Sequence, residues 1–163
     1  MIVISDTTPI ISLIKIDKLF LLQKLFGKVI IPQAVYDELV SNPKYTNEAI
    51  TVYNSSYISI VKIEDRQSVD KLRYSSGLDI GESEAITYSN LVNADLLLMD
   101  ELKGRKVAKQ LGLSITGTIG ILIQSFDEGF LDKEEIIKSI KTLKNSGRYI
   151  SDSLYYRLID RIA

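Results

Sequence analysis

Five short runs of apolar residues recur along the chain, and each is followed by a segment with helical features. The runs lie within residues 2–5, 28–32, 57–61, 96–99 and 113–116. Most of them are uniformly apolar rather than alternating, which is typical of strands buried on both faces of a parallel sheet. Helices that join consecutive parallel strands cover both faces of such a sheet. The order of elements therefore predicts an α/β fold with a central, mainly parallel sheet between helical layers.

Capping and stop signals predict the helices between and after these strands. Thr7 or Thr8 is expected to cap the first helix, with Pro9 near its first position. Ser151 is expected to cap the last one. Residues 75–77 are expected to form a loop. The other helices are expected at residues 18–26, 33–40, 47–54, 65–74, 81–92, 103–111, 117–126, 133–145 and 152–162.

The length of 163 residues suits one domain with a core of its own. No repeat, low-complexity segment or linker divides the chain. Residues from about 130 to 163 contain two predicted helices, which are too short to bury a separate core. We therefore expect a single domain over residues 1–163, with a helical C-terminal extension packed on it.

Two residue types that often carry chemistry are missing, since the chain has no cysteine and no histidine. Their absence excludes disulfides, thiolate or histidine zinc sites, cysteine nucleophiles and Ser-His-Asp catalysis. Any chemistry must then depend on acids, lysine, tyrosine or hydroxyl groups. Carboxylates act most naturally through a hard divalent cation.

The remaining composition is that of an ordinary globular protein, with 45% hydrophobic residues, 25% charged residues and a formal net charge of −1. The chain as a whole is therefore not a polycation that seeks nucleic acid, although a local basic surface is compatible with it. No apolar run is long enough for a membrane span, and we see no signal peptide. We expect a cytoplasmic protein, which the lack of cysteine also fits.

Acidic residues stand at or near the carboxyl ends of predicted strands, where open α/β sheets place their sites. Asp6 follows the first strand and Asp100 the fourth, whereas Glu82 begins a helix and Glu38 lies within one. Taken singly, each has an ordinary explanation as a turn residue, a helix-start acid or part of an exposed helical face. Taken together, four carboxylates at one site would repel each other, and a divalent cation would offset that repulsion. Such a cation can activate water for phosphodiester hydrolysis.

Four stretches of the chain stand out together: "VISDTTPIISLIKIDKLFLLQKLFGKVIIPQAVYDEL", "GESEAI", "LLLMDELKGRKVAKQLGL" and "ITGTIGIL". In this order they resemble the motifs of PIN-domain proteins, in the PIN-like subgroup often grouped with VapC-type toxins. The resemblance implies a three-layer α/β/α fold and a site for one or two Mg²⁺ or Mn²⁺ ions. By position it implies that the ligands and catalytic acids are Asp6, Glu38, Glu82 and Asp100.

The same resemblance implies auxiliary groups around these acids. Thr7 and Thr8 supply the hydroxyl that commonly follows the first acid, and Glu84 and Glu101 are neighbours that could assist or substitute. The chain departs from many PIN proteins in two ways, because Glu82 replaces an aspartate and Leu98 replaces a threonine. The longer Glu82 can still reach a metal, whereas Leu98 removes a polar contact near the ligands.

Basic residues that could contact RNA follow the fourth acid. Lys103, Arg105 and Lys106 are the candidates, with Arg105 matching the family's Gly-Arg pair, and a solvated helix face is the alternative explanation. The "TGTIG" segment offers a site hydroxyl at Thr116 or Thr118. The C-terminal helices carry tyrosine and arginine, for which packing on the domain is favoured over stacking on bases. These residues are Arg148, Tyr149, Tyr155, Tyr156, Arg157 and Arg161.

The first functional hypothesis is a metal-dependent endoribonuclease that acts as the toxin of a type II toxin–antitoxin pair. The resemblance implies RNA as the substrate, an antitoxin protein as a partner and a homodimeric state. The lack of a long apolar run predicts no membrane association. A second hypothesis is a catalytically weak or inactive PIN-like module for binding or assembly. A third is a phosphatase-like or nucleotide-hydrolysing enzyme that uses the same acids.

Overall fold

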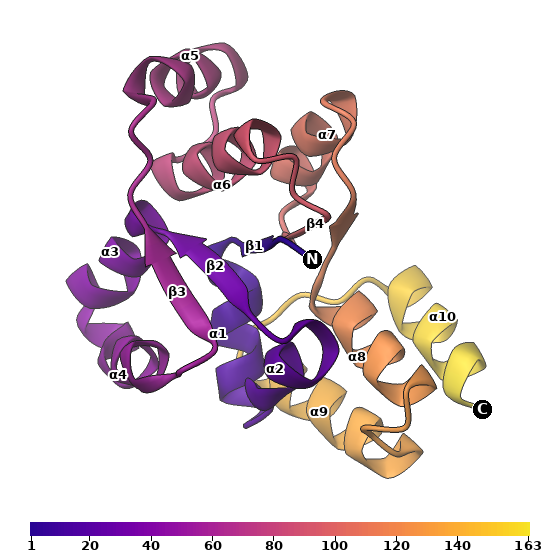
Figure 1. Ribbon diagram of the computed structural model, residues 1–163. Helices are drawn as coiled ribbons and strands as arrows, with labels where there is room; N and C mark the ends of the chain where they lie inside the picture. Colours follow the sequence, from indigo (N-terminus) through magenta and orange to yellow (C-terminus); the bar gives the residue numbers. More distant parts are fainter.

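A five-stranded sheet runs through the centre of the computed structural model, which describes residues 1–163 (Figure 1). The strand order is β3-β2-β1-β4-β5, and all four neighbouring pairs are parallel. The predicted α/β class with a parallel sheet is therefore confirmed. The strands are β1 (Val3–Ser5), β2 (Val29–Pro32), β3 (Ile58–Val61), β4 (Leu96–Leu98) and β5 (Ile115–Thr116).

Ten α-helices flank the sheet, giving the three-layer α/β/α arrangement expected from the sequence. A short 3-10 helix, η1 (Pro43–Tyr45), precedes α4 and was not predicted. The α-helices are α1 (Thr7–Lys15), α2 (Phe20–Phe26), α3 (Gln33–Ser41), α4 (Thr46–Asn54), α5 (Arg66–Ser76), α6 (Ile80–Leu91), α7 (Leu102–Gln110), α8 (Thr118–Asp127), α9 (Lys133–Asn145) and α10 (Asp152–Ile162). None of them is both long and apolar enough to span a lipid bilayer.

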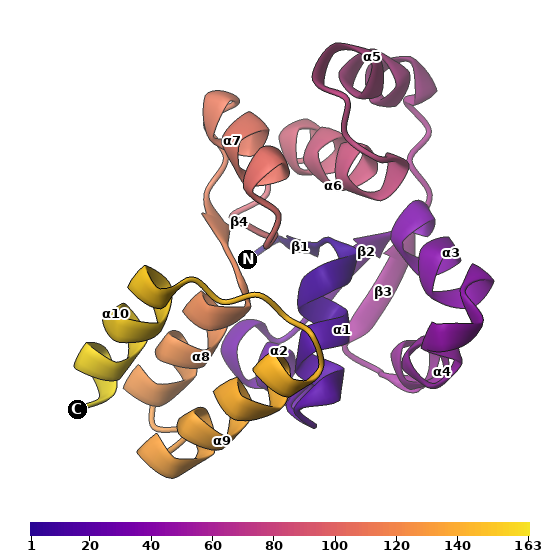
Figure 2. The ribbon, with the colours of Figure 1, turned by 180° about the vertical axis from the view of Figure 1, so that it is seen from behind.

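The two helical layers differ in size. Figure 1 shows α5, α6 and α7 on one side of the sheet, with α1, α2, α8 and α9 on the other. The α3–α4 pair lies beside β3 at one end, and α10 packs along α8 at the other (Figures 1 and 2). The sheet therefore has one thin and one thick cover.

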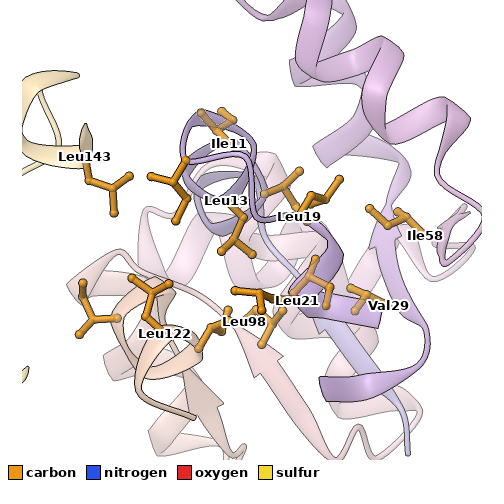
Figure 3. Packing of buried hydrophobic residues seen from close by; sticks show 14 of the residues in the cluster. Ile11, Leu13, Leu19, Leu21, Val29, Ile58, Leu98, Leu122 and Leu143 are labelled. Atoms are coloured by element: carbon orange, nitrogen blue, oxygen red, sulfur yellow. The ribbon is translucent and has the colours of Figure 1, made fainter. Parts of the chain in front are cut away.

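Alternate residues of the central strands feed two separate cores, as expected for strands buried on both faces. Val3 and Leu98 join a cluster of 26 buried residues on the thick side, in which α1, α2, α8 and α9 participate. Figure 3 shows part of this cluster, where Leu13, Leu21, Leu98 and Leu122 pack together. Ile4 and Leu97 point the other way, into a cluster of only seven buried residues under α6 and α7.

The C-terminal helices contribute to the larger core. Ile136, Ile140 and Leu143 of α9 and Leu158 of α10 are buried within it. The apolar side chains on one face of α9 are thus used for packing against the domain. Ser151 caps α10 as predicted, because its hydroxyl accepts a hydrogen bond from the Leu154 N–H at 3.2 Å.

Two local predictions are wrong. Asp6, with extended backbone, takes the position before α1, and both threonines lie inside the helix, so neither Thr7 nor Thr8 caps it. The Thr7 hydroxyl instead donates a hydrogen bond to Glu38 of α3. Residues 75 and 76 belong to α5 rather than to a loop, and Gly77 ends that helix with a φ of 69°. A glycine suits this left-handed conformation, which side chains disfavour.

Candidate active site

The ends of β1 and β4 bring two predicted acids to the same edge of the sheet. Ser5 lies opposite Leu98 in the parallel ladder, and the Asp6 N–H donates to the Leu98 carbonyl at 2.9 Å. Asp6 therefore follows β1 directly, and Asp100 comes two residues after Leu98 on the neighbouring strand. The strand register alone thus places both acids at the carboxyl edge, where sites of open α/β sheets lie.

Asp6 is a buried acid, with only 4% of its surface exposed. Its side chain makes no capping hydrogen bond, although it stands before the first turn of α1. Burial raises the pKa of Asp6 to about 8, and the Thr7 N–H partly opposes this rise. The negative charges of Asp79, Glu82 and Glu38 raise the pKa of Asp6 further. Asp6 is therefore the centre of an acidic cluster, defined here as Asp6, Glu38, Asp79 and Glu82.

Glu38 joins the cluster from α3. The Thr7 hydroxyl donates a hydrogen bond to Oε2 of Glu38 at 2.6 Å and so connects the start of α1 to α3. Gly81 fits between two of the acids, because a Cβ there would lie 3.6 Å from Oε2 of Glu38 and 3.5 Å from Oδ1 of Asp79. The first turn of α6 thus approaches α3 closely on the side where the acids gather.

Asp79 and Glu82 form a reciprocal cap at the start of α6. The Glu82 N–H donates to Oδ1 of Asp79 at 2.8 Å, and the Asp79 N–H donates to Oε2 of Glu82 at 3.0 Å. Burial is the main cause that raises the pKa of Glu82. The negative charges of Asp79 and Glu101 raise this pKa further. The sequence prediction missed Asp79. The spacing Asp-Ile-Gly-Glu is a capping-box signal that could have identified it.

Asp100 has different surroundings, because it is hydrogen-bonded and paired with a cation. Its Oδ1 accepts from the Thr118 N–H at 2.8 Å, and its Oδ2 accepts from the Thr118 hydroxyl at 2.7 Å. The guanidinium of Arg148, between α9 and α10, lies 2.8 Å from Oδ2 of Asp100. Arg105 lies close by and donates to the Met99 carbonyl at 2.9 Å. Asp100 thus holds together α8 and the C-terminal segment.

Gly117 is the residue that lets these groups meet. A Cβ at this position would lie 2.5 Å from Oδ1 of Asp100 and 3.1 Å from Nη1 of Arg105. The space for a side chain is therefore already filled by the carboxylate and the guanidinium. In the "TGTIG" segment, Thr118 supplies the hydroxyl that contacts Asp100, and Thr116 does not form that bond.

Glu84, which the sequence presents as a neighbour of Glu82, is buried and hydrogen-bonded through both oxygens, although it lines one hollow together with Glu38 and Asp79. One of its oxygens accepts from the Ala34 N–H at 3.1 Å, in the first turn of α3. The other accepts from Arg66 at 2.7 Å. This buried carboxylate therefore connects α6 to α3 and to the start of α5.

The basic residues after Asp100 are divided between two surfaces. Arg105 faces the cavity beside Asp100. Lys103 and Lys106 border a different hollow against α5, and Lys103 donates to the Gly77 carbonyl at 3.1 Å. Glu101 is exposed at the start of α7, and its charge acts on Glu82.

The acidic cluster has the donor chemistry that a hard divalent cation requires. Its members supply only carboxylate oxygens, and no basic side chain forms an ion pair with Asp6, Glu38, Asp79 or Glu82. As arranged, however, no group of three or more acidic side chains converges closely enough to hold one ion. Glu38 and Glu82 would have to exchange their present hydrogen bonds for a metal ion. The carboxylates therefore fit such an ion in chemical type, and they would have to move closer together to bind it.

Comparison with protein families matches residues 2–163 to the PIN domain. This chain is a PIN-domain protein. The match covers nearly the whole sequence, including α9 and α10, and confirms the family resemblance noted from the sequence. No curated protein matches the chain. The PIN domain belongs to a nuclease superfamily whose members generally depend on divalent metals.

Proposed function

We propose that this PIN-domain protein is a metal-dependent endoribonuclease. The observation that carries the proposal is Asp6, a buried carboxylate at a strand end, with three other acids acting on it and no cation paired with it. Holding such a charge in the folded protein is unfavourable unless a proton or a metal neutralises it. A buried carboxylate with other acids around it at the carboxyl edge of the sheet is therefore better explained by a cation site than by a turn.

In this proposal Asp6, Glu38 and Glu82 hold Mg²⁺ or Mn²⁺, with Asp79 as a further donor and Asp100 completing the set from β4. When bound, one or two such ions would lower the pKa of water and stabilise charge on a phosphodiester during hydrolysis. Asp6 would provide the fixed, buried contact. Thr7 would hold Glu38 in position through the 2.6 Å hydrogen bond.

Asp100 would contribute from the neighbouring strand end, after β4. Its hydrogen bonds to Thr118 fix the carboxylate, and Arg148 and Arg105 lie on its other side. Guanidinium groups next to a metal site suit the binding of phosphate. Asp100 therefore marks the border between acids that would bind the ion and arginines that would bind RNA.

The biological setting that we propose is a toxin of a type II toxin–antitoxin pair in the cytoplasm, acting as a homodimer with a cognate antitoxin. The support is the resemblance of the motifs to the VapC-type subgroup. Expression of the chain would then arrest growth, Asp6→Asn would relieve the arrest, and a small protein encoded next to it would co-purify with it. Normal growth during expression of an active nuclease would contradict the toxin role alone.

The decisive experiment is cleavage of labelled single-stranded RNA with Mg²⁺ or Mn²⁺, compared with EDTA, single-stranded DNA and free nucleotides. We expect RNA cleavage that needs metal and that Asp6→Asn lowers by at least about 100-fold, because a ligand at the reacting centre is lost. Asp70→Asn is the matched control, since Asp70 is exposed on α5 and forms no ion pair. Full RNase activity in purified Asp6→Asn protein would refute the mechanism, and hydrolysis of nucleotides alone would favour the third hypothesis.

A second candidate function, a non-catalytic PIN-like module, is favoured by two contacts. Asp100 is already paired with Arg148, and Glu82 is already part of a helix cap. Calorimetric titration with Mn²⁺ separates the two functions. Binding that Asp6→Asn abolishes supports the nuclease, and no binding at millimolar Mn²⁺ supports the module.

A further inference from the structure

A cavity of about 430 Å³ lies beside Asp100 and is separate from the acidic cluster. It is bordered by the starts of α7 and α8 and by the segment between α9 and α10, which crosses the start of α8 (Figure 2). Its charged lining residues are Asp100, Arg105, Arg148 and Arg157. Three arginines against one aspartate give this lining a positive balance, although the chain as a whole carries a net charge of −1. Such a lining selects an anion.

The three arginines are held in different ways. Arg148 is fixed by Asp100, and Arg105 is fixed by the Met99 carbonyl. Arg157 is exposed on α10, and no hydrogen bond or ion pair engages its side chain. Two preformed guanidinium groups and one free group suit a phosphodiester, because each offers several N–H donors in a planar fork.

An aromatic side chain stands next to this basic lining. Tyr149, which borders the cavity, is 85% exposed. Tyr155 of the same C-terminal region is packed instead, with the Lys144 ammonium 4.2 Å from its ring centre and Tyr156 edge-on at 5.7 Å. Packing thus accounts for Tyr155 but not for Tyr149. An exposed ring beside arginines is the arrangement by which proteins stack unpaired bases.

We propose that this cavity binds one nucleotide of a single-stranded RNA next to the cleaved bond, with Arg148 and Arg157 on phosphate and Tyr149 stacked on the base. The inference rests on the proposed ribonuclease function and names the substrate-binding residues of that site. Its volume is in the range of pockets that enclose small ligands, so it suits a nucleotide unit and not a duplex. The C-terminal segment then selects unpaired strands.

Binding measured without cleavage tests this inference. Fluorescence anisotropy of a labelled single-stranded oligoribonucleotide is recorded in EDTA for the wild-type chain, Arg157→Ala, Tyr149→Ala and Arg73→Ala. Arg157 and Tyr149 are both exposed, so their loss is not expected to disturb folding. Arg73 is the matched control, because it is an exposed arginine on α5 that does not border the cavity.

We expect Arg157→Ala and Tyr149→Ala each to weaken binding at least about fivefold, and Arg73→Ala to change it less than twofold. Arg157→Ala should also make the negative slope of log affinity against log salt concentration less steep by about 0.7, because one phosphate contact is lost. Tyr149→Ala should leave that slope unchanged, since stacking releases no counterion. Duplex RNA of the same sequence should bind more weakly than the single strand.

The outcomes separate this inference from the proposed function. Wild-type affinity in both cavity variants would overturn the inference even if metal-dependent cleavage is found. Weaker binding in both variants would support it even if the chain cleaves nothing. Binding of poly-glutamate together with no binding of single-stranded RNA would overturn it and indicate an acidic peptide as the ligand.

Discussion

Asp6 and Asp100 end neighbouring strands of one sheet but have opposite surroundings. Asp6 is buried, lacks a cation partner and has other acids near it. Asp100 accepts two hydrogen bonds from Thr118 and pairs with Arg148. The register pairs Ser5 with Leu98, so Asp6 comes one residue after this pair and Asp100 two, and alternation directs them to opposite faces of the sheet. Different helices therefore reach each strand end, with acids near Asp6 and a hydroxyl and guanidinium groups near Asp100.

The two halves of this edge would therefore have separate functions. The half around Asp6 gathers acidic side chains, and the half around Asp100 carries arginines. A phosphodiester and its metal ion need both properties side by side.

The largest effect concerns stability and pH. Folded Asp6 keeps its proton up to about pH 8, whereas in the unfolded chain it loses the proton near its ordinary value of 3.8. The stability from this group is therefore fully present below about pH 4 and is lost as pH rises through about 8. Urea unfolding without metal should show Asp6→Asn becoming more stable relative to wild type over this interval, by on the order of a few kcal/mol at pH 8. A difference that does not change with pH would contradict the buried, unpaired state of Asp6.

The opposite sign is expected at Asp100. Asp100→Asn should lower the free energy of unfolding by roughly 1–3 kcal/mol at pH 7, because Arg148 loses its charged partner and Thr118 a carboxylate acceptor. The same urea experiment measures it, with Asp70→Asn as the exposed control. If both Asp6→Asn and Asp100→Asn changed the free energy of unfolding in the same direction at pH 8, the two acids would not have opposite surroundings.

Metal binding should depend on pH through Asp6. A cation must displace the proton that Asp6 keeps up to about pH 8, so the affinity for Mn²⁺ should rise about tenfold per pH unit between pH 6 and 8. Calorimetry in two buffers of different ionisation enthalpy should detect the released proton. Affinity that is flat over this range would mean that Asp6 is not a ligand.

The smallest effect is expected at Glu84, whose two oxygens already accept hydrogen bonds from Ala34 and Arg66. Glu84→Gln should lower the free energy of unfolding by about 1 kcal/mol, because the ion pair with Arg66 is lost while the Ala34 N–H keeps an acceptor. Mn²⁺ affinity should stay within twofold of wild type. A large loss of metal affinity at unchanged stability would instead assign Glu84 to the site.

The sheet and the positions of Asp6 and Asp100 could be predicted because their signals are local. Apolar runs such as Leu96–Leu98 identify buried strands, and an acid directly after such a run must lie at the strand's end. Parallel pairing then brings the two acids to one edge. The predicted cap of the first helix, Thr7 or Thr8, was wrong. Aspartate and threonine are both good cap residues, and only the backbone path decides between Asp6 and the two threonines.

The partners of the acids could not be predicted, because they depend on tertiary packing. Nothing near Asp100 in sequence indicates that Arg148 will reach it, and the inward direction of Glu84 depends on where α3 and α5 lie. Asp79 is an intermediate case. Its capping-box spacing was visible, but its influence on Asp6 depends on how α6 crosses the sheet.

The unequal cores have a consequence for motion. Asp6 leads into α1, which is anchored in the cluster of 26 buried residues, whereas Asp79 and Glu82 begin α6, which lies over the cluster of seven. Layers with few buried contacts open at lower free energy, so amide hydrogens of α5–α7 should exchange faster than those of α1 and α8. The acids thus meet at the boundary between α1, which is held by the larger core, and α6, which covers the smaller core. An ion that binds both Asp6 and Glu82 would link these two parts and slow the exchange of amide hydrogens in α6.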